Sequence, residues 1–137
     1  MVHKIVCAVD GTSHSDKAVQ FAAELANKLG SKLTIASVNV LIGGIRSGAM
    51  YANEESEVRK VLDNAAKAAT AAGAKDVQTA FLRSREASAG IVAYAEQEDC
   101  DIIVTGTGDK HGLSRLVLGS VAADIAGKAH CTVIIAR

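Results

Sequence analysis

The segment GTGDKHGLSRLVLGS, residues 106–120, carries residue types that can bind a phosphate. Gly106 and Gly108 directly follow an apolar run, and glycine at such a turn lets a ligand approach main-chain N–H groups. Gly119 and Ser120 open a predicted helix, whose free amides and positive dipole end attract phosphate oxygens. Ser120 would add a hydroxyl donor, or it could serve only as the N-cap of that helix. Because the segment has neither a Walker A pattern nor GxGxxG, its interpretation depends on where the fold places it.

Asp10 is the second candidate for chemistry, since it ends the apolar run of residues 5–9 and precedes Gly11. A carboxylate at the end of a strand could accept hydrogen bonds from a ribose or a base. Asp-Gly is also an ordinary turn, so Asp10 could instead only cap the next helix or bond the local backbone. Both interpretations stay open from the sequence.

Predicted strands and helices alternate along the whole chain and must position these residues. Short apolar runs rich in β-branched residues predict strands, and apolar residues three and four positions apart predict helices. The first helix is expected to be capped by Ser13 or Ser15 and to end at Gly30. The predicted strands are residues 5–9, 33–40, 77–82, 101–105 and 132–136, and the three later helices are residues 54–72, 87–98 and 120–128.

This alternation predicts an α/β fold: a doubly wound, five-stranded parallel sheet of order 3-2-1-4-5 with helices on both faces. In that order the winding reverses between the first and fourth strands, and ligands bind beyond the carboxyl ends of the strands at the reversal. The turns AVDGTSHS and GTGDKHG, which contain Asp10 and Gly106, would lie side by side there. A ligand site is therefore predicted between them.

Composition limits the domain organisation and the partners. A chain of 137 residues fits one domain over residues 1–137. Acidic and basic residues balance at 15 each, and two Tyr, two Phe and no Trp offer few stacking platforms, so nucleic acid is not an expected partner. Three cysteines without metal-type spacing favour a reducing compartment, and no segment approaches a membrane span. A cytoplasmic protein without a membrane partner is expected.

The segments IVCAVDGTSHSDKAVQFAAELA and DIIVTGTGDKHGLSRLVLGSVAADIAGKAHCTVIIAR resemble the universal stress protein family of small single-domain proteins. Many members bind ATP through a signature of Gly, two residues, Gly, nine residues, then Gly and Ser or Thr. Gly106, Gly119 and Ser120 fill the first, third and fourth marked places, and Asp109 stands at the second. The resemblance implies a stress-response regulator that binds an adenine nucleotide, ATP or AMP, with or without Mg²⁺.

The resemblance also implies which residues contact the nucleotide. Asp10 would contact the adenosine, Val38 would pack beside the base, and Val121 would help frame the phosphate end. Ala8 stands where relatives often carry proline, and Gly108 stands where many ATP-binding relatives carry Arg or His. The full set of expected nucleotide-binding residues is Ala8, Asp10, Val38, Thr105, Gly106, Gly108, Asp109, Gly119, Ser120 and Val121.

Asp109 replaces the glycine that lets the backbone approach the phosphates in nucleotide-binding relatives. A carboxylate about 5 Å from one phosphate charge would repel it by roughly 3 kcal/mol at an effective dielectric constant near 20. Mg²⁺ could offset this repulsion, because it binds carboxylate and phosphate oxygens at the same time. The alternative interpretation is a non-nucleotide interaction module of the same fold, with a phosphate site that Asp109 disables.

Efficient catalysis and a metal centre are not expected. Only Asp10 and Asp109 are candidates for positioning a hydrolytic water or its metal, so slow ATP hydrolysis is the most that this sequence predicts. His14 and His111 lie on the two turns that should meet, but they belong to no clustered ligand motif. Catalytic and metal-binding residues are therefore predicted to be absent.

The closing run TVIIA, residues 132–136, would form an edge of the sheet, and an exposed apolar edge invites pairing with another chain. Universal stress proteins commonly form homodimers through this strand with the two copies antiparallel, so the resemblance implies a homodimer. Residues 41–53 form the longest predicted loop, which makes them a candidate lid or second contact surface.

Overall fold

The computed structural model of the chain describes residues 1–43, 48–108 and 118–137. Every strand and helix predicted from the sequence is present, with ends that differ by at most two residues. The elements in chain order are β1 (Lys4–Ala8), α1 (Ser13–Leu29), β2 (Lys32–Val40), α2 (Glu55–Ala71), β3 (Val77–Ser84), α3 (Ala87–Gln97), β4 (Ile102–Gly106), α4 (Ser120–Lys128) and β5 (Thr132–Ala136).

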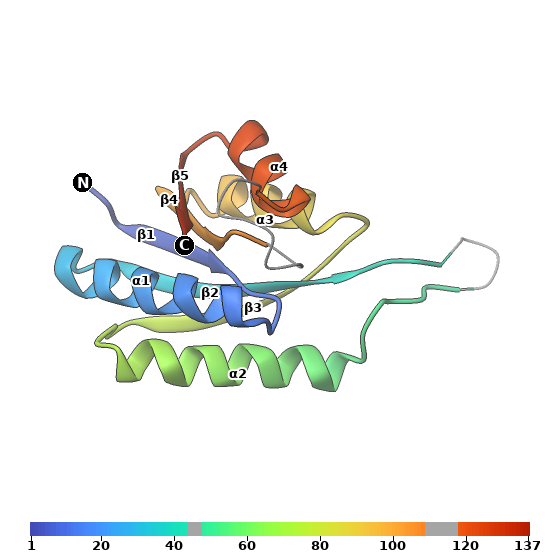
Figure 1. Cartoon of the computed structure of the whole chain (residues 1–137), viewed down its shortest axis with the longest axis horizontal. Helices are drawn as coiled ribbons and strands as arrows, with labels where there is room; N and C mark the ends of the chain where they lie inside the picture. Colours follow the sequence, from blue (N-terminus) through green and yellow to red (C-terminus); the bar gives the residue numbers. More distant parts are fainter. Residues whose placement is uncertain (44–47, 109–117) are drawn as a thin grey trace.

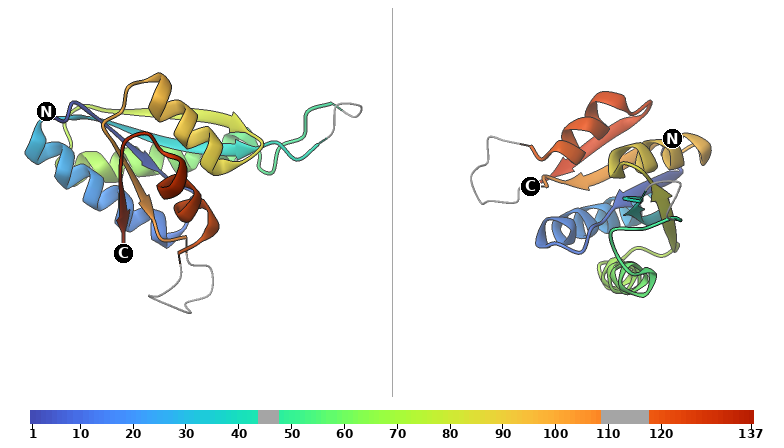
Figure 2. Two further views of the ribbon diagram at one scale, coloured as in Figure 1. Left: turned by 90° about the horizontal axis from the view of Figure 1, so that it is seen from above. Right: turned by 90° about the vertical axis from the view of Figure 1, so that its right-hand side faces the viewer.

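The strands form one parallel sheet in the order β3-β2-β1-β4-β5, which confirms the predicted topology. β1 pairs with β2 on one side and with β4 on the other, so the winding reverses between β1 and β4. Helices α1 and α2 cover one face of the sheet, and α3 and α4 cover the other (Figures 1 and 2).

Two apolar clusters hold the layers together. Ile5 and Cys7 of β1 point into the cluster beneath α1 and α2, whereas Val6 and Ala8 point into the cluster beneath α3 and α4. Because β1 is buried on both faces of the sheet, its sequence is a continuous apolar run and does not alternate between apolar and polar residues. Within the described residues, no helix has the length and apolar character needed to cross a membrane.

The ends of α1 confirm one sequence expectation and correct another. Gly30 ends the helix as predicted, in the left-handed conformation (φ 66°) that glycine adopts without a steric penalty. The predicted caps Ser13 and Ser15 are wrong, because Thr12 is the N-cap and both serines lie inside the helix. The Ser15 hydroxyl instead bonds the carboxylate of Asp10.

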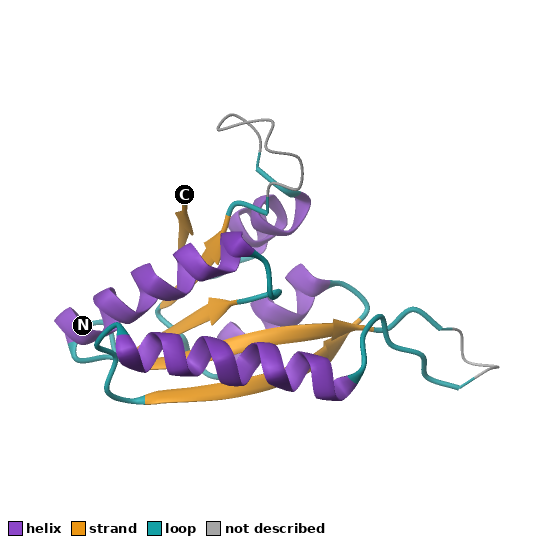
Figure 3. Ribbon diagram, turned by 60° about the horizontal axis from the view of Figure 1, so that its bottom comes forward, coloured by secondary structure: helices purple, strands orange, loops and turns teal. Residues whose placement is uncertain are grey.

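The described parts of residues 41–53 contain no helix or strand, in agreement with the predicted loop, but the two ends of the loop pair with each other. Leu41 and Tyr51 make an antiparallel bridge, and the Ile42 N–H donates to the Met50 carbonyl oxygen at 2.7 Å. Figure 3 shows this arm projecting beyond the carboxyl end of β2, away from the sheet and helices. The sequence did not predict the pairing, because the segment lacks the alternating pattern of a strand.

Candidate functional site

The first turn of α1, which follows the turn after β1, is in contact with the end of β4. A Cβ atom at Gly106 would lie 2.5 Å from the carbonyl oxygen of His14 in α1. Beyond β4, the Thr107 hydroxyl lies 3.5 Å from the Nδ1 atom of His14. The topology thus places these two segments together at the point where the winding of the sheet reverses, which is where doubly wound proteins bind ligands.

Two glycines bring the chain before α4 back to the end of β4. The Gly119 N–H donates to the carbonyl oxygen of Thr107 at 2.7 Å. A Cβ atom at Gly119 would lie 2.5 Å from the Gly108 carbonyl oxygen, and Gly108 itself has a φ of 68°. The close approach requires glycine at position 119, and the left-handed backbone favours it at position 108. Asp109, the residue that departs from the family signature, lies outside the described residues.

The amino end of α4 begins directly after this contact. Gly119 is the N-cap, and the first intrahelical bond runs from the Ala123 N–H to the Gly119 carbonyl oxygen. The amides of Ser120, Val121 and Ala122 therefore have no intrahelical acceptor. Ser120 is exposed and is not the N-cap, and its hydroxyl makes no hydrogen bond within the described residues. Such donors, together with the helix dipole, could hold an anion.

Asp10 is held by its own turn. Its Oδ1 atom accepts hydrogen bonds from the Thr12 N–H (2.9 Å), the Thr12 hydroxyl (2.6 Å) and the Ser15 hydroxyl (2.6 Å). Burial by itself would raise the pKa of Asp10, but the bonds from Ser15 and Thr12 outweigh it and hold that pKa below its ordinary value. The carboxylate is thus charged and oriented, and its Oδ2 atom accepts no hydrogen bond within the described chain.

The other expected site residues lie at the carboxyl ends of neighbouring strands. Ala8 and Val38 are half-buried and pack against the cluster beneath α3 and α4. Val38 also touches the start of α3, because a Cβ atom at Gly90 would lie 2.9 Å from its Cγ2 atom. Thr105 is buried, and its hydroxyl donates to the Gly106 carbonyl oxygen at 3.3 Å. Ala8 and Val38 could therefore form an apolar wall, whereas the Thr105 hydroxyl is directed to the backbone.

Sequence reasoning missed three roles that shape the site: Ser15 as a partner of Asp10, His14 as a contact of the end of β4, and Thr107 as the residue beside His14. Ser15 carried a usable signal, because a hydroxyl one helical turn after a strand-end aspartate can bond its carboxylate. The contact of His14 with Thr107 carried none, since it depends on the packing of two turns. No group of three or more His, Cys, Asp or Glu side chains in the described part of the chain is arranged to hold a metal ion.

The fold and this site define a doubly wound α/β protein in which the amino end of α4 lies beside the switch point. The whole chain, residues 1–137, matches the model of the universal stress protein family. The chain belongs to that family. One curated relative, a universal stress protein (MJ0531) of Methanocaldococcus jannaschii, is 31% identical over 140 residues, which cover 98% of this chain and 81% of the relative.

Two similar solved structures contain adenine nucleotides. A universal stress protein in complex with cAMP is 26% identical, with a TM-score of 0.79 and coverage of 99% of this chain and 97% of that one. The universal stress protein from Archaeoglobus fulgidus in complex with dAMP is also 26% identical, with a TM-score of 0.75 and full coverage of both chains. Adenine nucleotides are thus ligands of these two relatives.

Proposed function

We propose that this chain binds an adenine nucleotide where the turn after β1 meets the end of β4. The observation that carries the proposal is the contact of Gly106 with His14, which lies near the amino end of α4, whose first amides have no intrahelical acceptor. The amides that follow Gly119 and the Ser120 hydroxyl would bind a phosphate, and Val121 would flank it. The Oδ2 atom of Asp10, which accepts no hydrogen bond from the described residues, would accept one from a ribose hydroxyl.

The base would lie against the apolar wall formed by Ala8 and Val38. This arrangement is supported by the relatives that hold cAMP and dAMP, each of which presents one phosphate group and an adenine. ATP, with or without Mg²⁺, is the further ligand that the family signature suggests. Binding would make the protein a nucleotide-dependent regulator of a stress response in the cytoplasm.

Ligand release and calorimetry test this function. Protein purified from cells is denatured, the released small molecules are identified by mass spectrometry, and the refolded or ligand-free protein is titrated with ATP, AMP, cAMP and GTP with and without Mg²⁺. We expect adenine nucleotides to bind more tightly than GTP. No released nucleotide and no heat of binding at millimolar ATP or AMP would contradict the proposal.

One observation favours a second candidate, an interaction module of the same fold that binds no nucleotide. The Oδ1 atom of Asp10 is fully engaged with Thr12 and Ser15, as expected if this carboxylate only stabilises its turn. The two functions are separated by Asp10→Ala, measured at a temperature where the variant is folded. If Asp10→Ala lowers the affinity for the nucleotide, Asp10 contacts the ligand. An interaction module would bind no nucleotide, either as the wild type or as the variant.

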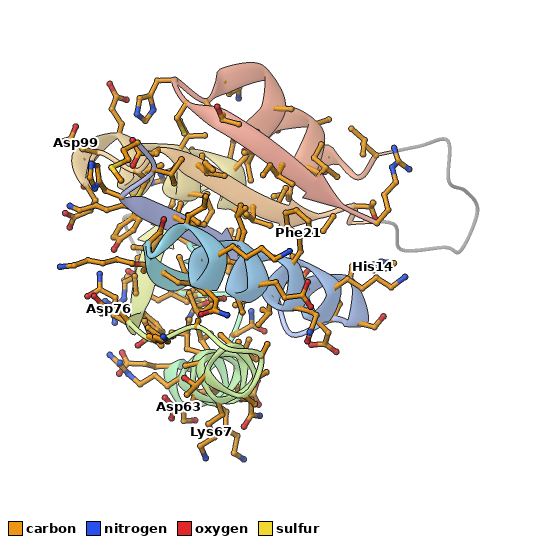
Figure 4. All side chains as sticks on the ribbon, turned by 90° about the vertical axis from the view of Figure 1, so that its left-hand side faces the viewer. His14, Phe21, Asp63, Lys67, Asp76 and Asp99 are labelled. Carbon is orange, nitrogen blue, oxygen red and sulfur yellow. The ribbon has the colours of Figure 1, made fainter. Side chains whose placement is uncertain are left out.

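We also propose a homodimer that forms through β5. Strand β5 is an edge of the sheet, and a groove of about 520 Å³ runs between it and α1. Phe21 of α1 is 42% exposed there, beside Ile134 and Ile135 of β5 (Figure 4). Antiparallel pairing of β5 with β5 of a second copy would provide hydrogen-bond partners for the main-chain groups along this edge of the sheet. It would also cover these apolar side chains.

A further inference from the structure

A second hollow, of about 310 Å³, lies on the other side of α1, between this helix and α2. The two helices run side by side over one face of the sheet (Figure 3). None of the residues proposed to contact the nucleotide lines this hollow. Its apolar floor consists of Val9, Val19, Val61, Ala65 and Ala68.

Small residues keep the hollow open. A Cβ atom at Gly11 would lie 3.1 Å from the Cγ2 atom of Val61, so the turn after β1 approaches α2 closely at one end. Along α2, alanine at positions 65 and 68 leaves space that a larger side chain would fill. Ala68 is exposed, which means that the sheet and helices do not depend on it for packing.

The rim of the hollow is polar and negatively charged. It is formed by Asp16 and Gln20 of α1 and by Asn64 of α2, and Asp16 is the only charged residue among the described residues that line the hollow. The Gln20 amide nitrogen donates to Glu24 at 2.9 Å, which leaves its carbonyl oxygen as an acceptor. The side chains of Asp16 and Asn64 make no hydrogen bond within the described chain.

Two of the charged residues of α2, Asp63 and Lys67, lie away from this rim: Figure 4 shows them pointing away from α1, on the outer side of α2. The hollow therefore combines an apolar floor with one carboxylate and two carboxamide oxygens above it. Convergent polar groups over an apolar surface are typical of small-molecule sites.

We propose that this hollow binds a small organic cation, namely a primary ammonium group carried on one apolar ring or short chain. An ammonium group offers three hydrogen-bond donors and no acceptor, and the Asp16 carboxylate with the oxygens of Gln20 and Asn64 offers acceptors and the opposite charge. A volume of about 310 Å³ is at the lower end for ligand sites, which run from roughly 300 to 1,000 Å³, so a single ring fits and a peptide segment does not.

The first test titrates the nucleotide-free protein with 2-phenylethylammonium and follows the side-chain amide signals of Gln20 and Asn64 by NMR. Two analogues of similar shape serve as controls: neutral 2-phenylethanol and anionic 3-phenylpropanoate. We expect the ammonium compound to bind roughly tenfold more tightly than the alcohol, and the carboxylate not to bind. No shift of either amide signal with millimolar ammonium, or equal affinity for the alcohol, overturns the proposal.

Three variants assign any binding to the hollow. Asp16→Asn keeps the shape and removes the charge, so the ammonium compound should bind roughly tenfold more weakly. Ala68→Leu fills the hollow and should abolish binding, whereas Ala71→Leu makes the same change at an exposed position of α2 outside the lining and should not alter it. Unchanged affinity in Ala68→Leu, or an equal loss in Ala71→Leu, overturns the assignment. Because no nucleotide is present, failure here leaves the nucleotide proposal untouched.

Discussion

Gly106 of β4 and His14 of α1 lie so close together that a Cβ atom on the glycine would stand 2.5 Å from the histidine carbonyl oxygen. Real Cβ atoms essentially never approach another heavy atom to that distance, and the obstructing atom belongs to the backbone. The first turn of α1 and the carboxyl end of β4 therefore pack main chain against main chain at the switch point.

Gly106→Ala should force the first turn of α1 away from the end of β4. We expect a loss of about 1–3 kcal/mol in the free energy of unfolding, as for overpacked interiors, together with weaker nucleotide binding. Chemical denaturation and calorimetry measure the two effects. The matched control is Gly127→Ala in α4, where a Cβ atom meets nothing within 4 Å and should add up to about 1 kcal/mol of stability. Equal stability of Gly106→Ala and the wild type would contradict the packing argument.

Asp10 should make stability depend on pH. The pKa of Asp10 is lower in the folded protein than in the unfolded chain, where it is about 4. The charged carboxylate therefore stabilises the fold above about pH 4. This contribution to the free energy of unfolding is lost as the pH falls through the lower pKa of the folded protein. Asp10→Asn should therefore be less stable than the wild type at pH 7, by about 1 kcal/mol at most for so exposed a group. The difference should shrink below about pH 4 in urea denaturation series.

A change at Ser13 is the control for Asp10. Ser13→Ala should be neutral at every pH, because Ser13 is an exposed helical residue that makes no hydrogen bond through its side chain within the described residues. A difference between wild type and Asp10→Asn that stays constant from pH 7 to pH 3 would show that the hydrogen bonds from Thr12 and Ser15 do not favour the charged carboxylate.

Asp109→Gly restores the family signature and should tighten ATP binding. A carboxylate about 5 Å from a phosphate charge costs roughly 3 kcal/mol at a dielectric constant near 20, and solvent reduces this, so we expect a gain of about tenfold or more. Calorimetry with ATP and with adenosine separates the effects, because adenosine carries no phosphate and should bind equally to both proteins. Unchanged ATP affinity would show that the side chain points away from the phosphates.

Phe21→Ala should weaken the proposed homodimer without unfolding the protomer. Phe21 is 42% exposed in the groove beside β5, so its removal costs apolar contact only if a second copy covers it. Leu29→Ala is the control, because Leu29 is 45% exposed on the same helix and does not line that groove. Sedimentation equilibrium should show weaker association for Phe21→Ala alone. Identical association of both variants and the wild type would exclude the α1 groove from the interface.

The three cysteines should differ in reactivity. Burial raises the pKa of Cys7 to about 12, and burial followed by the nearby Cys131 raises that of Cys100 to about 11. Burial also raises the pKa of Cys131, but this side chain is only partly covered. Because the thiolate is the reactive form, a disulfide reagent at pH 8 should modify Cys131 first and Cys7 only after unfolding. Mass spectrometry of the labelled peptides would contradict this if Cys7 reacted as fast as Cys131.

The fold was almost completely predictable from the sequence, because the hydrophobic periodicity, the residue propensities and the helix-stop signals all indicate the same elements. Buried β-branched runs, alanine-rich helices and the stop at Gly30 all indicate alternating strands and helices, and the right-handed crossover rule then leaves few arrangements. The failures were local. Ser15 was expected to cap the helix from its type and place, but the carboxylate of Asp10 competes for its hydroxyl.

Features that depend on two distant segments could not be predicted. The antiparallel pairing of Leu41 with Tyr51 lacks strand periodicity, and an ion pair of Arg83 with Glu55 at 2.7 Å joins the end of β3 to the start of α2. The hollow between α1 and α2 is lined by Asp16 and Gln20 from one helix and by Ala68 from the other, a combination that no local pattern contains. The order of the strands follows from local rules, whereas the shapes of the sites between elements do not.

The hydrogen bond from the Gly119 N–H to the Thr107 carbonyl oxygen joins the two ends of the segment that connects β4 to α4. Since this bond uses only main-chain atoms, an exchange of the side chain at position 107 leaves its donor and acceptor in place. The amino end of α4 should therefore stay beside the carboxyl end of β4 in variants of residue 107, because the backbone alone joins the strand to the helix there.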